Sequence, residues 1–165
     1  KKKKKKKKKL KRFKKEKVRD LIIESKYNDL ALTQFINKVM KHGKKNLARK
    51  IVYTALDEIE TQLKKPGIDV FTQAVRNVSP DVILKSRRVG GANYQVPTEL
   101  PREKSLTLAM RWIIESSRSR SGSAYHLRLA RELMDAYNSQ GPAIKRKDDI
   151  HKMAEANKAF AHFRY

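Results

Sequence analysis

The 165-residue chain contains no cysteine, which excludes disulfides, thiolate catalysis and cysteine-based zinc sites. No stretch approaches the roughly 18 consecutive apolar residues of a membrane-spanning helix. No apolar signal region follows the basic start, so a secretory peptide is not expected either. Acidic residues are also scarce, because 17 Asp and Glu stand against 41 Lys and Arg, giving a formal net charge of +24. Such a charge repels itself in a compact chain and predicts a polyanionic partner.

The residues that build most active sites and metal centres are missing or badly placed. Neither GxxxxGK[ST] nor GxGxxG occurs, and the four histidines form no recognisable triad with Ser and Asp. The carboxylates of Asp148 and Asp149 would point apart on a helix, since adjacent residues do not share a face. His151 and Glu155 would share one, but two ligands do not make a metal site. We therefore predict no catalytic residue, no metal site and no cofactor.

The positive charge is concentrated at the N-terminus. Residues 1–19 hold 15 basic residues and one acid, so this segment carries +14 and leaves +10 for the other 146 residues. Its first nine residues are all lysine, and like charges at this density cannot collapse without a counter-charge. We predict that residues 1–25 form an extension that is disordered or bound to RNA. Residues 26–165 should form a single helical domain that is itself basic.

Apolar residues in the body recur every three or four positions, as on one buried helical face. Gly43, Pro66-Gly67 and Ser79-Pro80 would end the first three helices. The fourth is the most apolar and should be central to the core, with Trp112 as a core residue rather than an RNA-stacking one. The six predicted helices cover about residues 32–40, 47–63, 70–78, 106–114, 127–137 and 150–161.

Residues 82–100 interrupt the helical pattern. They are rich in β-branched residues, contain Gly90-Gly91, and have Pro97 where no helix could continue, so they predict two arms of about eight residues around a glycine turn. A lone two-stranded hairpin is only marginally stable in water. We therefore expect an arm that projects from the bundle and is ordered by its partner. The predicted fold is mainly α: a six-helix bundle with a protruding β-hairpin between the third and fourth helices.

Cations of the hairpin and of the last predicted helix are candidates for nucleic-acid contacts. Arg87 and Arg88 could bind phosphates bidentately or stack on bases, and the glycine turn would admit a close backbone approach. The alternative is that they keep an exposed strand edge from aggregating. Lys145, Arg146 and Lys147 stand near a helix start, where cations oppose the macrodipole and favour an external anion. The alternative for these three residues is that they form a solvated helix face whose positive charge is partly offset by nearby acidic residues.

The segment from Arg118 to Ser123 (RSRSGS) is predicted to be a flexible basic loop between two helices. Its serines and arginines are consistent with phosphorylation or with phosphate contact. A plain polar loop between helices explains them equally well.

Four stretches resemble signatures of the ribosomal protein S seven family. The two long ones are KSRRVGGANYQVPTEL (residues 85–100) and KRKDDIHKMAEANKAFAHFRY (residues 145–165), and HGKKNLARKIVYTAL and LAMRWIIESSRSR match in the same order. The resemblance covers essentially everything from about Asn28 onward. It is of the bacterial type, which includes mitochondrial and plastid versions. The lysine-rich start up to Ser25 departs from the usual short basic arm of the family.

The resemblance implies the same fold, a six-helix bundle with a β-hairpin between the third and fourth helices. It implies a structural protein that binds the 3′ major domain of small-subunit rRNA directly and early and nucleates assembly of the subunit head. The implied partners are this rRNA, mRNA, exit-site tRNA and ribosomal proteins S nine and S eleven. No membrane contact and no homo-oligomer are expected.

The resemblance also divides the basic residues into two groups. Those nearest the mRNA and exit-site tRNA would be the hairpin residues Lys85, Arg87, Arg88, Gly90 and Gly91. Those that grip rRNA would lie in the N-terminal arm and the last helix, namely Lys11, Arg12, Lys14, Lys15, Lys145, Arg146, Lys147, Lys152, Lys158 and Arg164.

Two other function classes stay open on the residues alone. A DNA-binding or architectural protein would place one helix in a major groove and the lysine tail over phosphates, although no helix-turn-helix module requires the hairpin. An RNA-processing nuclease would need a convergent acid/base set that cannot be assembled here. The expected location is the ribosome, in the bacterial cytoplasm or in a mitochondrion or plastid. The missing initiator Met leans toward a processed organellar chain.

Overall fold

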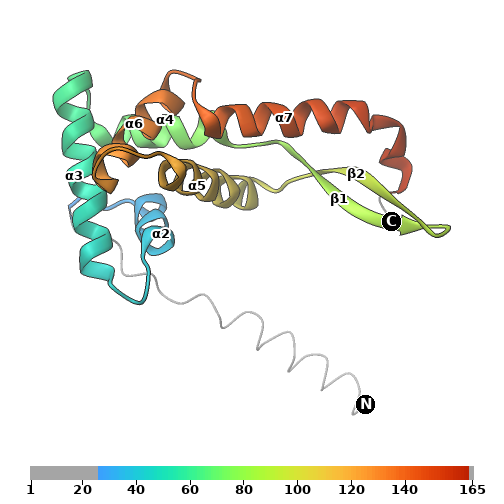
Figure 1. The fold of residues 1–165 in the computed structure, drawn as a ribbon, viewed down its shortest axis with the longest axis horizontal. Helices are drawn as coiled ribbons and strands as arrows, with labels where there is room; N and C mark the ends of the chain where they lie inside the picture. The colour runs from blue at the N-terminus through green and yellow to red at the C-terminus, as the bar shows by residue number, and fades with distance from the viewer. Residues whose placement is uncertain (1–25, 164–165) are drawn as a thin grey trace, which may run out of the picture. The chain divides into compact units, whose positions relative to one another are not determined.

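The computed structural model of the protein describes residues 26–163 (Figure 1). The chain divides into two units, Lys1–Phe35 and Ile36–Tyr165, and the division falls within the first described helix, α2 (Leu30–Val39). The predicted extension, residues 1–25, lies outside the described residues. The extension and the single domain that should follow it therefore stay predictions.

Helix α2 begins at a capped N-terminus. The Asp29 Oδ1 atom accepts a hydrogen bond from the backbone N–H of Leu32 at 2.7 Å, and the Thr33 hydroxyl donates to the Asp29 carbonyl at 2.8 Å. Aspartate at this position satisfies an amide that the first helical turn leaves unpaired. The predicted apolar face is confirmed, because its patterned residues Leu32, Phe35, Ile36 and Val39 are buried.

The second unit confirms the predicted fold class. Its elements are α3 (Lys45–Leu63), α4 (Gly67–Val78), β1 (Val82–Val89), β2 (Ala92–Glu99), α5 (Arg102–Ser119), α6 (Tyr125–Tyr137), α7 (Pro142–Ala156) and the 3-10 helix η1 (Lys158–Phe163). The described residues thus form six α-helices with an antiparallel hairpin between the third and the fourth. Among the described helices, none is long and apolar enough to cross a membrane.

The last helix is displaced from its prediction. It starts at Pro142, where a proline in the first turn loses no helical hydrogen bond, and Gly141 precedes it at a φ of 91°. It ends at Asn157, whose backbone N–H and side-chain amide both donate to the Met153 carbonyl. The continuous helix predicted to residue 161 is therefore wrong beyond Ala156, because this side chain competes for the backbone and the chain tightens into η1.

Helix α6 makes the most extensive helix–helix contacts in the second unit, with α3, α4, α5 and α7. The sequence predicted that α5, the fourth helix, would be central to the core. It does bury a wide stripe that includes Met110, Trp112 and Ile113, which confirms its core role. The prediction is wrong for Leu47, the first residue assigned to the buried face of α3. Its side chain is 54% exposed.

A close approach of α3 and α4 depends on glycine. A Cβ atom at Gly67 would lie 2.9 Å from the carbonyl oxygen of Leu56, nearer than real contacts allow. The Gly67 backbone N–H also donates to Glu60 Oε1 at 2.9 Å. The break at Pro66-Gly67 is thus a tight corner, with Pro66 as the N-cap of the next helix.

A buried acidic residue joins the end of α5 to α6 and α7. The Glu132 side chain is fully buried, and its two oxygens accept hydrogen bonds from Arg120 Nε at 2.7 Å and from the Ala143 backbone N–H at 3.2 Å. Asp135 also pairs with Arg120, at 2.5 Å. Burial raises the pKa of Glu132, and the hydrogen bond and charge of Arg120 limit the rise. Burial works against the charge of Arg120, but its bonds to Asp135 and Glu132 outweigh burial and raise its pKa.

The hairpin has the predicted length and turn. Val89 pairs with Ala92, so the loop has two residues, and Gly90 and Gly91 take φ values of 58° and 90°. Two successive positive φ values are costly for any residue with a Cβ, which explains the glycine pair. At the other end, the Leu100 backbone N–H donates to the Asp81 carbonyl at 2.9 Å and closes the base.

The expectation that the hairpin is ordered by an external partner stays a prediction, but the arm does not stand alone, because α7 and η1 pack along it (Figure 1). The rings of Tyr94 and Phe160 lie 5.1 Å apart, and Val96 is buried. His151 Nε2 on α7 accepts a hydrogen bond from the Asp81 backbone N–H at 3.3 Å. Figure 1 shows the hairpin extending away from α3 while it runs beside α7.

Replacing Trp112 tests its core role. The side chain is 3% exposed, so Trp112→Ala should reduce the free energy of unfolding by about 3–5 kcal/mol. The Arg146 guanidinium lies 5.5 Å from the ring centroid, and Arg146→Ala should cost no more than about 1 kcal/mol because this side chain is exposed. Urea unfolding of both variants measures the difference. Equal, small losses would contradict a buried tryptophan that supports the core.

Glu132 and Asp135 provide a matched pair of carboxylates on one arginine. Glu132→Ala should cost about 3–5 kcal/mol, because it removes the buried partner of Arg120 and leaves the Ala143 amide unpaired. Asp135→Ala should cost about 0–1 kcal/mol, since the side chain is 41% exposed. Thermal unfolding compares the two. A larger loss for Asp135→Ala would show that burial does not determine the strength of this cluster.

Candidate nucleic-acid interface

The three predicted cations of the hairpin are exposed, and none of them forms an ion pair with another described residue. Opposed residues of an antiparallel ladder share a face of the sheet. Arg87 is opposite Tyr94, on the face that packs on η1, whereas Arg88 is opposite Asn93 on the other face. Lys85 is opposite the buried Val96. The ribbon therefore presents its cations on both faces, and no described carboxylate neutralises them.

Two cations of α7 are engaged within the protein. Arg146 pairs with Glu115 at 2.5 Å and lies over the Trp112 ring. The Lys147 ammonium donates to the Asn77 carbonyl at 2.7 Å, at the end of α4. Both residues therefore have a structural role in joining α7 to the bundle, and their contact with rRNA stays a prediction.

The other predicted cations of the C-terminal region differ from these two. Lys145, Lys152 and Lys158 are exposed, and no ion pair with a described residue occupies them. They leave three positive charges along α7 and the start of η1. The remaining predicted contacts, Lys11, Arg12, Lys14, Lys15 and Arg164, lie outside the described residues.

The segment predicted as a flexible basic loop is largely structural. Arg118 and Ser119 belong to the last turn of α5, and Arg120 is held by Glu132 and Asp135. Arg118 also donates to the Val39 carbonyl at 3.2 Å. Only the short stretch 120–124 links α5 to α6.

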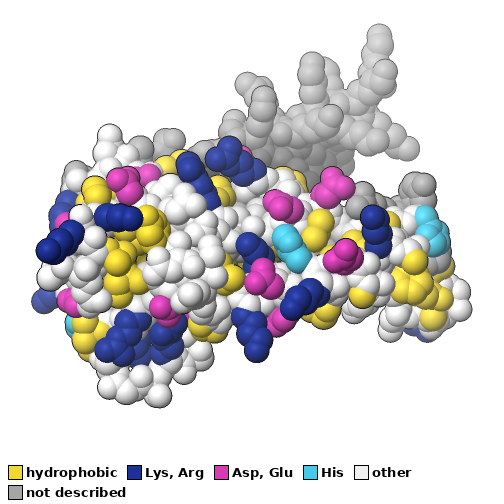
Figure 2. Space-filling view, turned by 90° about the horizontal axis from the view of Figure 1, so that it is seen from above, with side chains coloured by type: hydrophobic (Ala, Val, Ile, Leu, Met, Phe, Trp, Pro, Cys, Tyr) yellow, Lys and Arg dark blue, Asp and Glu magenta, His cyan; other side chains and the backbone are white. Residues whose placement is uncertain are grey.

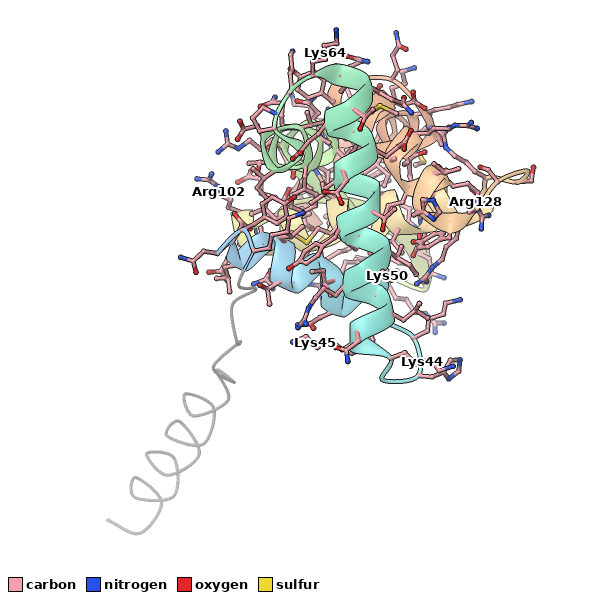
Figure 3. The ribbon with its side chains drawn as sticks, turned by 90° about the vertical axis from the view of Figure 1, so that its left-hand side faces the viewer. Lys44, Lys45, Lys50, Lys64, Arg102 and Arg128 are labelled. Atoms are coloured by element: carbon pink, nitrogen blue, oxygen red, sulfur yellow. The ribbon has the colours of Figure 1, made fainter. Side chains whose placement is uncertain are left out.

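A further basic region lies at the N-terminal end of α3, and the sequence reasoning did not single it out. Lys41 and Lys44 precede the helix. Figure 3 shows Lys44, Lys45 and Lys50 toward this end of α3 and Lys64 at its other end. Arg128, on α6, is labelled to one side of α3 in the same view. The first turn of α3 contains no acidic residue, so its cations oppose the helix dipole. The run KHGKK between two helices was the available signal.

Cations also crowd one another on α2 and α5. Burial, together with the nearby charge of Arg111, lowers the pKa of Lys38. A lysine whose pKa is lowered in part by a neighbouring cation marks positive charge that an anion would stabilise. In Figure 2, Lys and Arg side chains stand in several clusters with acidic side chains among them, rather than in one continuous patch.

The arrangement can bind a polyanion at several separate points. Exposed lysines and arginines neutralise phosphates without sequence preference. The hairpin arginines lie beside a glycine turn that would admit a close approach of the RNA, so they could also reach bases. Within residues 26–163, no group of three or more His, Asp or Glu side chains is arranged to hold a metal ion.

Comparison with known proteins identifies the family. A family model described as ribosomal protein S7p/S5e matches residues 6–158. A relative from Chloroflexus aggregans, named small ribosomal subunit protein uS7, is 54% identical over 140 residues, which cover 85% of this chain and 89% of the relative. Relatives of the same name from Roseobacter denitrificans and Mycoplasmopsis synoviae are 50% and 46% identical over 89% and 94% of this chain, and over 94% and 100% of their own lengths. The chain therefore belongs to the ribosomal protein S7p/S5e family, whose members are structural proteins of the ribosome and not enzymes.

Proposed function

We propose that the chain is a structural component of the small ribosomal subunit that binds the 3′ major domain of its rRNA and nucleates assembly of the head. Membership of the family and relatives named for the small subunit support the location in the ribosome. The net charge of +24 supports a polyanionic partner, and rRNA is the polyanion of that particle.

The observation that carries the proposal is the braced, cationic hairpin. Its arms pack against α7 and η1 within the protein, and Lys85, Arg87 and Arg88 remain exposed and unpaired among the described residues. A preordered arm loses less conformational entropy on binding than a flexible one. We assign it to the mRNA and exit-site tRNA.

The last helix combines two roles in this proposal. Lys145, Lys152 and Lys158 bind rRNA phosphates, while Arg146 and Lys147 hold α7 against the bundle. The N-terminal arm would add the cations of residues 11–15 to the rRNA contacts. Ribosomal proteins S nine and S eleven are the proposed protein neighbours, and no self-association is part of the function.

Binding to a folded transcript of the 3′ major domain tests the rRNA assignment. The protein should prefer this transcript over duplex DNA of equal charge in a filter-binding competition. Lys145→Gln combined with Lys152→Gln should weaken rRNA binding several-fold and lower the magnitude of the salt slope by roughly 0.7–0.9 per lost contact. Lys147→Gln is the matched control and should instead lower stability by about 1 kcal/mol. Equal affinity for rRNA and duplex DNA would contradict the assignment.

Replacing both tip arginines tests the division of labour. Arg87→Ser with Arg88→Ser should leave folding and head assembly intact, because neither side chain pairs with another described residue. Retention of exit-site tRNA by the assembled subunits should fall. The control is Arg76→Ser with Arg102→Ser, which removes the same charge from exposed positions on α4 and α5. Failure of head assembly, read by RNA footprinting, would place the hairpin in the primary rRNA site instead.

A further inference from the structure

A hollow of about 480 Å³ lies beside the basic N-terminal end of α3. The loop before α3, the first two turns of α3, the end of α5 and the first turn of α6 supply its walls. Its size is within the range of roughly 300–1,000 Å³ that small-molecule sites occupy. All of its lining residues belong to the second unit.

Part of the hollow is apolar. Leu47 and Ile51 stand one helical turn apart on α3, and Ala48 and Val39 are buried beside them. Leu47 is 54% exposed although the helical pattern assigns it to the core. The aromatic side chain of Tyr125 completes this surface. An apolar and aromatic surface of this kind stabilises a flat apolar group more than a phosphate.

The charged part of the hollow is entirely cationic. Lys41, Lys44, Arg118 and Arg128 line it, and no Asp or Glu does. Arg118 bonds to the Val39 carbonyl, and Arg128 bonds to the Arg118 carbonyl at 3.3 Å and to the carbonyl of Arg120. These carbonyls orient the guanidinium groups without cancelling their charge. No described carboxylate pairs with either arginine.

The tyrosine is also held in place. Its hydroxyl is hydrogen-bonded to the Ser117 hydroxyl at 3.3 Å, and the Arg128 guanidinium lies 5.6 Å from its ring centroid. A fixed aromatic ring beside an oriented guanidinium is the combination on which unstacked bases pack in RNA-binding proteins.

We propose that this hollow binds one unstacked nucleotide of the RNA. The base would lie against Leu47, Ile51 and Tyr125, and its flanking phosphates would contact Lys41, Lys44 and Arg118. This inference rests on the proposed RNA-binding function and adds to it a single-nucleotide site at the opposite end of the unit from the hairpin (Figures 1 and 3).

The test compares two single-stranded probes with equal phosphate numbers, oligoadenylate of eight nucleotides and an abasic ribose-phosphate octamer. Both probes offer the same phosphates to the lysine-rich residues 1–9, so the contribution of these lysines should cancel in the ratio of the two affinities. The full chain should bind the adenylate roughly tenfold more tightly, as expected of one or two stacked bases.

Leu47→Gln should remove most of this preference without changing the melting temperature, because the side chain is exposed. The control is Met153→Gln on α7, another hydrophobic side chain about half exposed, which should keep the preference. Lys44→Gln should weaken both probes by the same factor, since it removes only a phosphate contact.

The outcomes separate the hollow from the function on which it rests. Equal affinity for both octamers, or equal losses in the Leu47 and Met153 variants, overturns the nucleotide site while binding to the 3′ major domain persists. Displacement of the adenylate from the wild type by a glutamate-rich peptide, with no base preference, would assign the hollow to a protein partner and also overturn it. A chain that binds neither octamer nor the rRNA transcript fails the proposed function itself.

Discussion

The buried carboxylate of Glu132 is the interaction on which the second unit depends most. One of its oxygens orients Arg120 at the end of α5, and the other satisfies the Ala143 amide in the first turn of α7. Helix α6, which carries Glu132, packs against α3, α4, α5 and α7. The cluster therefore fixes where α7 leaves the bundle. Because α7 in turn braces the hairpin, the position of the exposed arginines of the arm follows from a contact made far from them.

Excess positive charge is the second constraint. A chain of +24 has few carboxylates for ion pairs, and several are used to hold cations that the fold needs. Glu115 pairs with Arg146, and Glu132 with Asp135 holds Arg120. Cations outside these ion pairs include Lys85, Arg87 and Arg88 on the hairpin, Lys145 and Lys152 on α7, and Lys41 and Lys44 before α3. The division between paired and unpaired cations thus distinguishes residues with a structural role from those that we propose for RNA contacts.

The hairpin combines packing contacts with the cations that we propose for RNA binding. Tyr94 and Val96 on β2 face the C-terminal helices, while β1 carries most of the charge. β1 itself packs on α7 while β2 packs on η1, so the strand that carries Lys85, Arg87 and Arg88 is supported within the protein. The glycine turn at its tip needs no neighbouring contact, since nothing lies within 4 Å of a Cβ at Gly90 or Gly91. Positive φ values alone require these glycines.

Local sequence patterns were enough to predict six helices, the hairpin, its two-residue turn and the basic character of the chain, although not the bounds of α7. Apolar spacing identifies the face of a helix, and a glycine pair between β-branched arms identifies a turn, because both depend on residues close in the chain. Only the tertiary structure decided that Arg146 and Lys147 bond within the protein, that α6 makes the most extensive helix–helix contacts and that Leu47 is exposed beside a hollow. These facts depend on elements distant in the sequence, such as the Asn77 carbonyl that lies against Lys147. Local periodicity specifies which way a side chain points, whereas the packing of distant elements determines what it meets.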